Sequence, residues 1–320
     1  MNRVCILGGT GFVGRHLVAA LSHHHDIRCR VLCRHPQRHA GLRVIPGTEL
    51  VRAPNLDSAF LVEQFQSCDA VINLIGILNQ SKRASFRRIH VELADRVANA
   101  AIQAGARRLL HMSALHADAA RGTSEYLRSK GEGENRAHTH AGSALKVTSF
   151  RPSVIFGEGD SFFNRFAALL QLSPLPFPLA CPRSRFAPVW VGDVGELFVR
   201  TLYDESTAGK HFDLCGPKSY SLQELVAYTA RTIGLRRMII PLGDSLSRLQ
   251  AHLLGLMPGR PFTLDNYLSL QTDSICENNS AFERFDITPH AIESIVPRYL
   301  AQRNYRGSLN RLRRDISSGN

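Results

Sequence analysis

The segment "RVCILGGTGFVGRHLVAAL" near the start of the chain joins three structural signals in a fixed order. Residues 3–7 form an apolar run typical of a strand, and residues 12–21 repeat apolar side chains at helical spacing. Between them lie Gly8, Gly11 and Gly14, spaced three residues apart. Such glycines allow a tight turn, close approach of a pyrophosphate to the backbone, and close packing of the helix on the strand. The segment therefore predicts a nucleotide phosphate site at the start of a helix.

Strand and helix patterns continue to alternate through the first half of the chain, which predicts repeated βαβ units. The run at 69–76 is continuously apolar, as expected of a strand covered by helices on both faces. Further strand-like runs lie at 27–34, 49–53, 107–113 and 146–152. The expected fold class is α/β, a Rossmann-type doubly wound parallel sheet with a smaller, mostly helical C-terminal lobe.

The domain organisation follows from changes in this pattern. An NADP-binding Rossmann domain is expected at 1–156, completed by 189–215, and a substrate or partner lobe at 157–188 and 216–300. Residues 173–188 contain five prolines, so we expect an irregular lid or substrate loop there. Residues 301–320 are basic and are expected to form a flexible tail.

The composition is strongly basic, with 39 Lys and Arg against 27 Asp and Glu and a formal net charge of +12. This excess favours anionic partners, such as cofactor phosphates, nucleic acid or an acidic membrane face. No nucleic-acid readout motif is present, so no nucleic acid is expected. The chain shows no apolar run long enough to span a membrane and no leader pattern. Its seven scattered cysteines predict reduced thiols and a cytoplasmic location.

The end of the second predicted strand indicates which dinucleotide binds. An NAD-type site has an acidic side chain there for the ribose 2′-hydroxyl. This chain has Arg34 instead, with Arg38 close behind. Because a guanidinium suits a phosphate better than a neutral hydroxyl, the sequence predicts NADP(H), with NAD(H) as the possible alternative.

Five motifs, in the same order as in a known family, add to this interpretation. They are "GGTGFVG", "NLIG", "YLRSK", "FRPSVIFG" and "VWVGDV". With them the chain resembles the extended, atypical short-chain dehydrogenase/reductase superfamily, which includes the NAD-dependent epimerase/dehydratase family. "RLLHMSALHAD", "EYLRSKGEGE" and "FRPSVIFGEGDSFFNRFA" make it most similar to the branch formed by the NADPH-binding accessory subunits of respiratory complex I and their bacterial relatives.

The resemblance implies a set of cofactor-binding residues. These residues would contact the pyrophosphate, the 2′-phosphate, the adenine, the ribose and the nicotinamide end of the cofactor. In the order of the sequence they are Gly8, Thr10, Gly11, Phe12, Val13, Gly14, Arg34, Asn55, Leu56, Leu74, Ile75, Gly76, Ser113, Tyr126, Lys130 and Val154. No metal ligands are implied.

The resemblance also implies catalytic roles for Tyr126 and Lys130, which lie one helical turn apart. In the family the lysine lowers the tyrosine pKa, and the tyrosine exchanges a proton with substrate. A serine or threonine normally completes the set, but our alignment places Leu115 at that position and Ser113 beside the cofactor. A shift of one or two residues would restore the hydroxyl. The usual asparagine of the preceding helix is also replaced, by His90.

The segment 244–260 sets Leu246, Leu249, Leu253 and Leu256 on one side of a helix. We interpret this stripe as core packing of the C-terminal lobe, and the alternative is contact with an acidic membrane surface or a partner subunit.

Two functions remain open from the sequence. The first is an NADPH-binding protein with at most weak turnover and a structural, assembly or sensing role near the respiratory chain. Its partners would be complex I subunits or the inner face of the membrane, as a peripheral protein. The alternative is an NADPH-dependent oxidoreductase or epimerase that acts on a carbonyl, sugar-nucleotide, quinone or isoprenoid-like substrate through Tyr126 and Lys130.

Overall fold

The computed structural model describes residues 2–81, 84–140, 142, 144–172, 176–277 and 280–301. The chain divides into two compact units. Unit 1 comprises Met1–Pro152, Val191–Leu214 and Cys276–Thr288, and unit 2 comprises Ser153–Trp190, Cys215–Ile275 and Pro289–Asn320. Residues 276–288, which the sequence placed in the C-terminal lobe, thus belong to unit 1. All but the first residue of the predicted tail at 301–320 lies outside the described residues.

Unit 1 is built on a seven-stranded sheet in the order β11-β6-β5-β4-β1-β2-β3. All neighbouring strands are parallel. The strands are β1 Arg3–Leu7, β2 Arg28–Cys33, β3 Thr48–Arg52, β4 Ala70–Asn73, β5 Arg108–Met112, β6 Lys146–Pro152 and β11 His211–Leu214. The order reverses between β1 and β4, which is the point where such folds bind their ligands. The predicted doubly wound α/β fold is confirmed.

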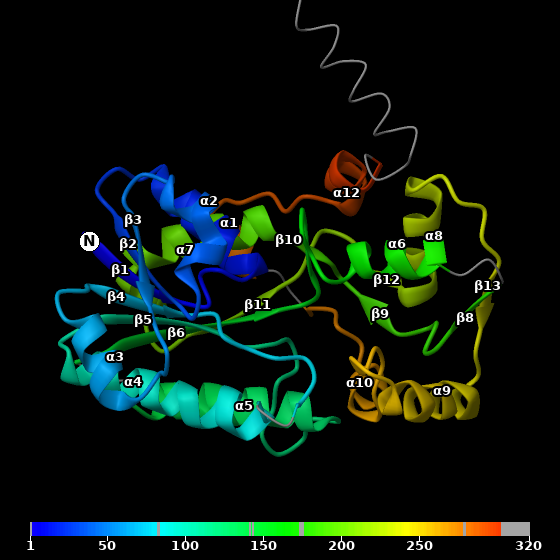
Figure 1. Ribbon diagram of the computed structural model, residues 1–320, viewed down its shortest axis with the longest axis horizontal. Coiled ribbons are helices and arrows are strands. Elements are labelled where there is room, and N and C mark those ends of the chain that lie inside the picture. Colours follow the sequence, from blue (N-terminus) through cyan, green and yellow to red (C-terminus); the bar gives the residue numbers. More distant parts are fainter. Residues whose placement is uncertain are drawn as a thin grey trace, which may run out of the picture. The chain divides into compact units, whose positions relative to one another are not determined.

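Helices cover both faces of this sheet (Figure 1). One face carries α1 Phe12–Ser22 and α7 Val191–Tyr203, and the other carries α3 Ser58–Phe65, α4 Leu93–Gln103 and α5 Glu125–Thr139. The remaining helical segments of unit 1 are η1 Pro36–His39, α2 Ala40–Arg43, the π-helical turn η2 Arg87–Glu92, η3 Glu205–Thr207 and α11 Ser280–Arg284. Burial of apolar side chains on both sheet faces stabilises this arrangement and explains why β4 and β5 are buried along their whole length.

Unit 2 has a separate apolar core formed around Phe156, Phe163, Leu225 and Val296. Its helices are α6 Phe163–Leu172, α8 Leu222–Thr232, α9 Asp244–Leu256, α10 Leu264–Ser269 and α12 Ile292–Leu300. Its strands are β7 Ile155–Phe156, β8 Phe177–Leu179, β9 Arg185–Phe186, β10 Val189–Trp190, β12 Tyr220–Ser221 and β13 Ile239–Pro241. They pair two by two.

Several local expectations from the sequence can be compared with this structure. The proline-rich segment is not wholly irregular, because β8 and β9 lie in it and pair with β13 and β12. Helix α8 begins with a capping box formed by Ser221 and Glu224. The prediction of reduced thiols holds for five cysteines, Cys5, Cys29, Cys33, Cys68 and Cys181, whereas Cys215 and Cys276 are disulfide-bonded. No helix among the described residues is long and apolar enough to cross a membrane.

Candidate functional site

The glycine loop between β1 and α1 is shaped for close backbone contacts. Gly8 has φ +80°, a left-handed conformation that favours glycine, and its carbonyl accepts a hydrogen bond from the Gly11 amide at 3.0 Å. A Cβ added to Gly14 would lie 2.3 Å from the Gly8 oxygen and 2.4 Å from the Gly9 Cα. Helix α1 can therefore approach β1 this closely only because residue 14 is glycine.

The same loop leaves the start of α1 open to an anion. Gly11 is the N-cap residue and provides no side-chain cap, and the first turn holds no acidic side chain. Phe12 and Val13 begin the helix, and Thr10 is half-buried in the preceding turn. Unsatisfied amides at a helix N-terminus attract phosphate. The residues present therefore fit the pyrophosphate of a dinucleotide.

The segment after β4 adjoins this loop. A Cβ on Gly8 would lie 3.1 Å from the Leu74 carbonyl carbon and 3.2 Å from the Ile75 amide nitrogen. The Leu74 amide donates to the Leu7 carbonyl at 3.0 Å, which holds the two strand ends together. A Cβ at the exposed Gly76 would lie 3.8 Å from the Lys130 Nζ atom and 3.7 Å from the His90 Nε2 atom. The structure thus brings β1, β4 and α5 together at the switch point.

Arg34 directly follows β2, as the sequence predicted, and its side chain is exposed. Among the described residues it makes no hydrogen bond or ion pair, so its guanidinium is available to a ligand. Asn55 and Leu56 follow β3, and the Asn55 amide donates to Asp57 at 2.6 Å. The Leu56 carbonyl accepts from Arg96 at 3.0 Å, which ties this segment to α4.

Tyr126 and Lys130 both lie in α5, which begins after its N-cap Ser124. Tyr126 is half-buried, with its ring edge-on to His90 at 5.6 Å between ring centroids. Lys130 is 5% exposed, and its ammonium donates to the Met112 carbonyl at 2.6 Å. Burial lowers the pKa of Lys130 to about 8, and the charge of Glu134 opposes this shift.

His90 lies in the π-helical turn η2 and links the β4 loop to α5. Its Nε2 atom accepts from the Ile77 amide at 3.1 Å, so the proton of the neutral ring resides on Nδ1 and points at the Ser129 hydroxyl, 2.8 Å away. That hydroxyl donates to the Tyr126 carbonyl at 2.9 Å. Burial and then the Lys130 charge lower the pKa of His90 to about 3, so the ring stays neutral at physiological pH.

Leu115, at the position we aligned with the catalytic hydroxyl, is buried and 4% exposed. Ser113 is also buried, and its hydroxyl donates to the Glu134 carboxylate at 2.6 Å. A contact of Ser113 with the cofactor would therefore use its backbone. The nearby hydroxyl that could replace a missing catalytic serine is engaged inside the protein.

Glu134, one helical turn beyond Lys130, is the acidic group that the sequence interpretation missed. It is fully buried and accepts from Arg151 Nε at 2.9 and 3.0 Å, and it contacts His211 of β11. Burial alone would raise the pKa of Glu134, but the hydrogen bond from His211, the charge and hydrogen bonds of Arg151 and the Ser113 hydroxyl together lower it to about 2. The i, i+4 spacing from Lys130 was the signal in the sequence that could have identified Glu134.

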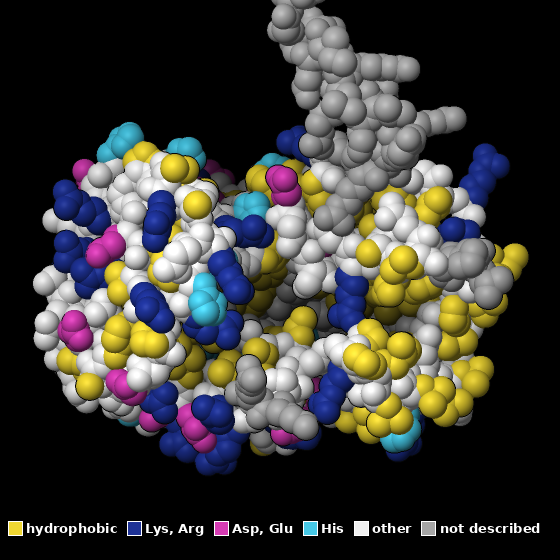
Figure 2. All heavy atoms as spheres, viewed as in Figure 1, with side chains coloured by type: hydrophobic (Ala, Val, Ile, Leu, Met, Phe, Trp, Pro, Cys, Tyr) yellow, Lys and Arg dark blue, Asp and Glu magenta, His cyan; other side chains and the backbone are white. Residues whose placement is uncertain are grey.

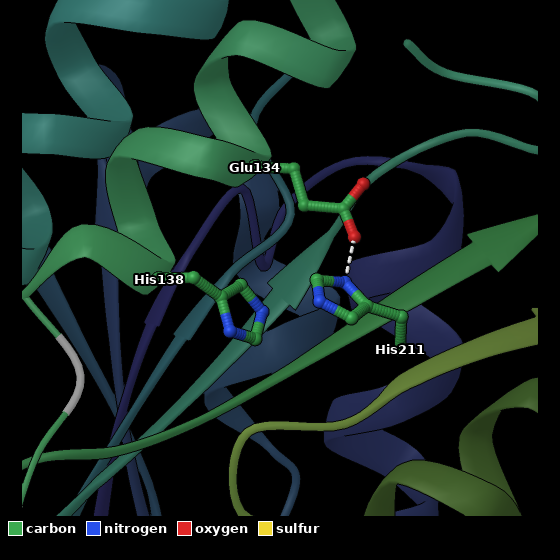
Figure 3. Close-up of side chains that lie close together, drawn as sticks. All are labelled: Glu134, His138 and His211. Atoms are coloured by element: carbon green, nitrogen blue, oxygen red, sulfur yellow. Dashed lines mark hydrogen bonds and ion pairs between the residues drawn. The ribbon is translucent and has the colours of Figure 1, made fainter.

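Glu134, His138 and His211 converge in the way that metal ligands do (Figure 3), with one donor atom of each within 4.8 Å of the others. However, Arg151 already supplies a positive charge to the carboxylate, and His138 is 2.9 Å from the Ser149 hydroxyl. We interpret the cluster as an ion-pair network around the buried Glu134 carboxylate, which holds α5 against β6 and β11.

Val154 belongs to unit 2, and its carbonyl accepts from the Val189 amide at 3.0 Å. Its predicted contact with the nicotinamide stays a prediction. Asp193, in the motif "VWVGDV", lies buried in the first turn of α7.

Comparison with known proteins agrees with this geometry. Residues 8–161 match the family model described as NAD(P)H-binding. The chain is 30% identical over 264 residues to subunit 9 of the NADH dehydrogenase [ubiquinone] 1 alpha subcomplex of Mus musculus mitochondria. This match covers 81% of the present chain and 68% of the mouse protein. It is 29% identical over 241 residues to a ceramide reductase of Caulobacter vibrioides, covering 75% and 74%. The solved structure of MoeE5 with UDP-glucuronic acid and NAD shares the fold at a TM-score of 0.70 and 18% identity, covering 94% and 97% of the two chains.

Proposed function

The chain belongs to the NAD(P)H-binding family that includes subunit 9 of the mitochondrial NADH dehydrogenase 1 alpha subcomplex, and from this premise we propose that it binds NADPH as a structural or sensing component of the respiratory chain. It would act as a peripheral protein on the inner face of the membrane, with at most weak turnover. The bound cofactor can supply a hydride. The protein's own residues bind and orient it.

The binding role is supported residue by residue. Gly8, Gly11 and Gly14 would hold the pyrophosphate, and Arg34 the 2′-phosphate. Lys130, fixed by the Met112 carbonyl beside Gly76, would donate to the ribose at the nicotinamide end. An ammonium held in this place stabilises the bound dinucleotide whether or not a substrate is present.

One observation favours binding over turnover. The Ser113 hydroxyl is committed to Glu134, and residue 115 is a buried leucine. A carbonyl substrate beside Tyr126 would therefore lack the hydroxyl that normally orients its oxygen for proton transfer.

The alternative remains an NADPH-dependent reductase or epimerase that uses Tyr126 and Lys130. It is supported by the placement of both residues on α5, with Tyr126 against His90 and Lys130 buried, and by the relative named as a ceramide reductase. In that reaction Tyr126 would pass a proton to or from the substrate oxygen.

The test is affinity isolation of the tagged full-length protein from solubilised membranes, followed by mass spectrometry and assay of bound nucleotide. We expect respiratory-chain subunits and NADPH to co-purify with the wild-type protein. Isolation without any respiratory subunit, together with NADPH oxidation that a carbonyl substrate drives and that Tyr126→Phe abolishes, would overturn the structural role and support the alternative.

A further inference from the structure

Helix α9 of unit 2 has the opposite arrangement to that of an ordinary surface helix. The side chains that it buries are small, Ser247 and Ala251. Its large apolar side chains face solvent: Leu246, Leu249, Leu253 and Leu256 are 55%, 52%, 56% and 77% exposed. Our interpretation of this stripe as core packing was therefore wrong.

The exposed stripe continues beyond the helix. Met257, directly after α9, is 50% exposed. Before the helix, Met238, directly preceding β13, is 70% exposed and Ile240, in β13, is 43% exposed. In Figure 2 hydrophobic side chains gather over α9. Of the thirteen large hydrophobic residues that are exposed among the described residues, ten belong to unit 2, so the feature is local and not a general property of the surface. An apolar patch of this kind marks a contact site.

The charges along the stripe are mainly basic. The one acidic residue of α9 is Asp244 at its start, whose carboxylate accepts a hydrogen bond from the Tyr267 hydroxyl at 2.6 Å. Residues 245–264 contain Arg248, Arg260 and His252 and no acidic residue. On the helix Arg248 and His252 fall beside the leucine stripe, and both are exposed. Arg248, and Arg236 just before β13, make no hydrogen bond or ion pair among the described residues.

From this combination we propose that α9 docks the protein onto an anionic phospholipid surface. The helix would lie in the plane of the membrane with its leucines among the acyl chains and its arginines at the phosphates. Long basic side chains suit this position because their stems stay apolar while their heads reach the phosphates. A second copy of the chain would instead set arginine against arginine, so it is a poor occupant. This proposal rests on the proposed function, because it names the surface on which the respiratory-chain role would take place. The two can be tested separately, since the protein could bind NADPH without binding phospholipid.

The experiment is flotation of the purified full-length protein with protein-free vesicles. One set contains phosphatidylglycerol in phosphatidylcholine and the other contains phosphatidylcholine only. The variants are Leu249→Gln/Leu253→Gln and Arg248→Glu. The matched control is Val44→Gln, which changes an apolar residue that is 81% exposed in unit 1. NADPH affinity and the melting temperature are measured on every variant, and should stay unchanged because the substituted side chains are exposed.

We expect the wild-type protein and the control to float with anionic vesicles and to dissociate at high salt. The double variant should bind at least about tenfold more weakly, since it removes two exposed leucines whose burial among the acyl chains would contribute to binding. Equal flotation with neutral vesicles, or no loss in the double variant, would overturn the proposal. Binding to native membranes but not to protein-free vesicles would also overturn it and identify the occupant as a protein. If the wild-type protein floats with anionic vesicles but does not bind NADPH, the result would instead count against the proposed function.

Discussion

At the scale of single residues, the site is organised by buried polar groups whose protonation is fixed by their surroundings. His90 is held neutral, with Nε2 committed to the Ile77 amide and Nδ1–H to Ser129. It thus joins the loop after β4 to the helix that carries Tyr126 and Lys130. A histidine in this role fixes the position of α5 relative to the loop after β4 and takes no proton at neutral pH.

Lys130 gives a prediction for the pH dependence of NADPH binding. Burial lowers its pKa to about 8, and a bound anionic dinucleotide would favour the ammonium form. Affinity should therefore begin to fall between about pH 7 and 8 and fall more steeply above pH 8, by at most about tenfold per pH unit. Titrations of NADPH between pH 7 and 10 measure this fall.

Two lysine variants test whether Lys130 is the group that titrates. In Lys130→Met binding should be weaker at every pH and the fall above pH 8 should vanish, whereas Lys210→Met, at an exposed position, should behave like the wild-type protein. An unchanged pH profile in Lys130→Met would show that another group titrates.

The sequence predicted these residues only in part. The spacing of Tyr126 and Lys130 on one helix face and the place of Arg34 after β2 follow from local pattern, and the structure agrees with both. The contact of Lys130 with the Met112 carbonyl could not be derived, because it forms only when α5 packs on the sheet. The proton position on His90 likewise depends on a tertiary contact with Ile77. Glu134, by contrast, lies one turn along the same helix as Lys130 and could have been identified from its spacing.

At the scale of elements, the approach of α1 to β1 is what makes the phosphate loop. Gly14 permits that approach because its missing side chain would overlap backbone atoms of Gly8 and Gly9. The backbone has little room to adjust, since β1 is paired with β2 on one side and β4 on the other.

Gly14→Ala is therefore expected to push α1 from the strand. We expect NADPH binding to fall by at least about tenfold and the protein to lose about 1–3 kcal/mol of stability, the usual cost of overpacking. Calorimetric titration and thermal unfolding measure the two effects. Gly41→Ala is the control, because a Cβ there meets no atom within 4 Å. Full NADPH affinity in Gly14→Ala would contradict this account of the loop.

The elements that the sequence predicted best are those with strong periodicity or flanking glycines, such as β1, α1 and β4. The π-helical form of η2 and the short strands β8 and β9 were missed. Each depends on a partner distant in sequence: α5 packs against η2 at Gly133, where a Cβ would lie 1.9 Å from the His90 oxygen, and β8 and β9 pair with β13 and β12. The outward orientation of the α9 leucines was also not predictable, since periodicity identifies an apolar face but not what covers it.

At the scale of the whole molecule, the two units contain different candidate sites. Unit 1 contains the glycine loop, Arg34 and the Tyr126–Lys130 pair, and unit 2 contains the apolar and basic surface of α9. The fold class and the family could be predicted because five motifs occur in order along the chain. The balance between cofactor binding and turnover could not, because it depends on where the Ser113 hydroxyl points.

The central claim is that unit 1 binds NADPH and that Arg34 causes its preference for NADPH over NADH. The most direct measurement is calorimetric titration of NADPH and NADH into the wild-type protein, Arg34→Ala and the control Arg183→Ala, an exposed arginine of unit 2. We expect the wild-type protein and the control to bind NADPH at least about tenfold more tightly than NADH, because a guanidinium–phosphate hydrogen bond contributes about 1.5–3 kcal/mol. Arg34→Ala should lose this preference and keep its NADH affinity. Equal affinities in the wild-type protein, or an undiminished preference in Arg34→Ala, would contradict the claim.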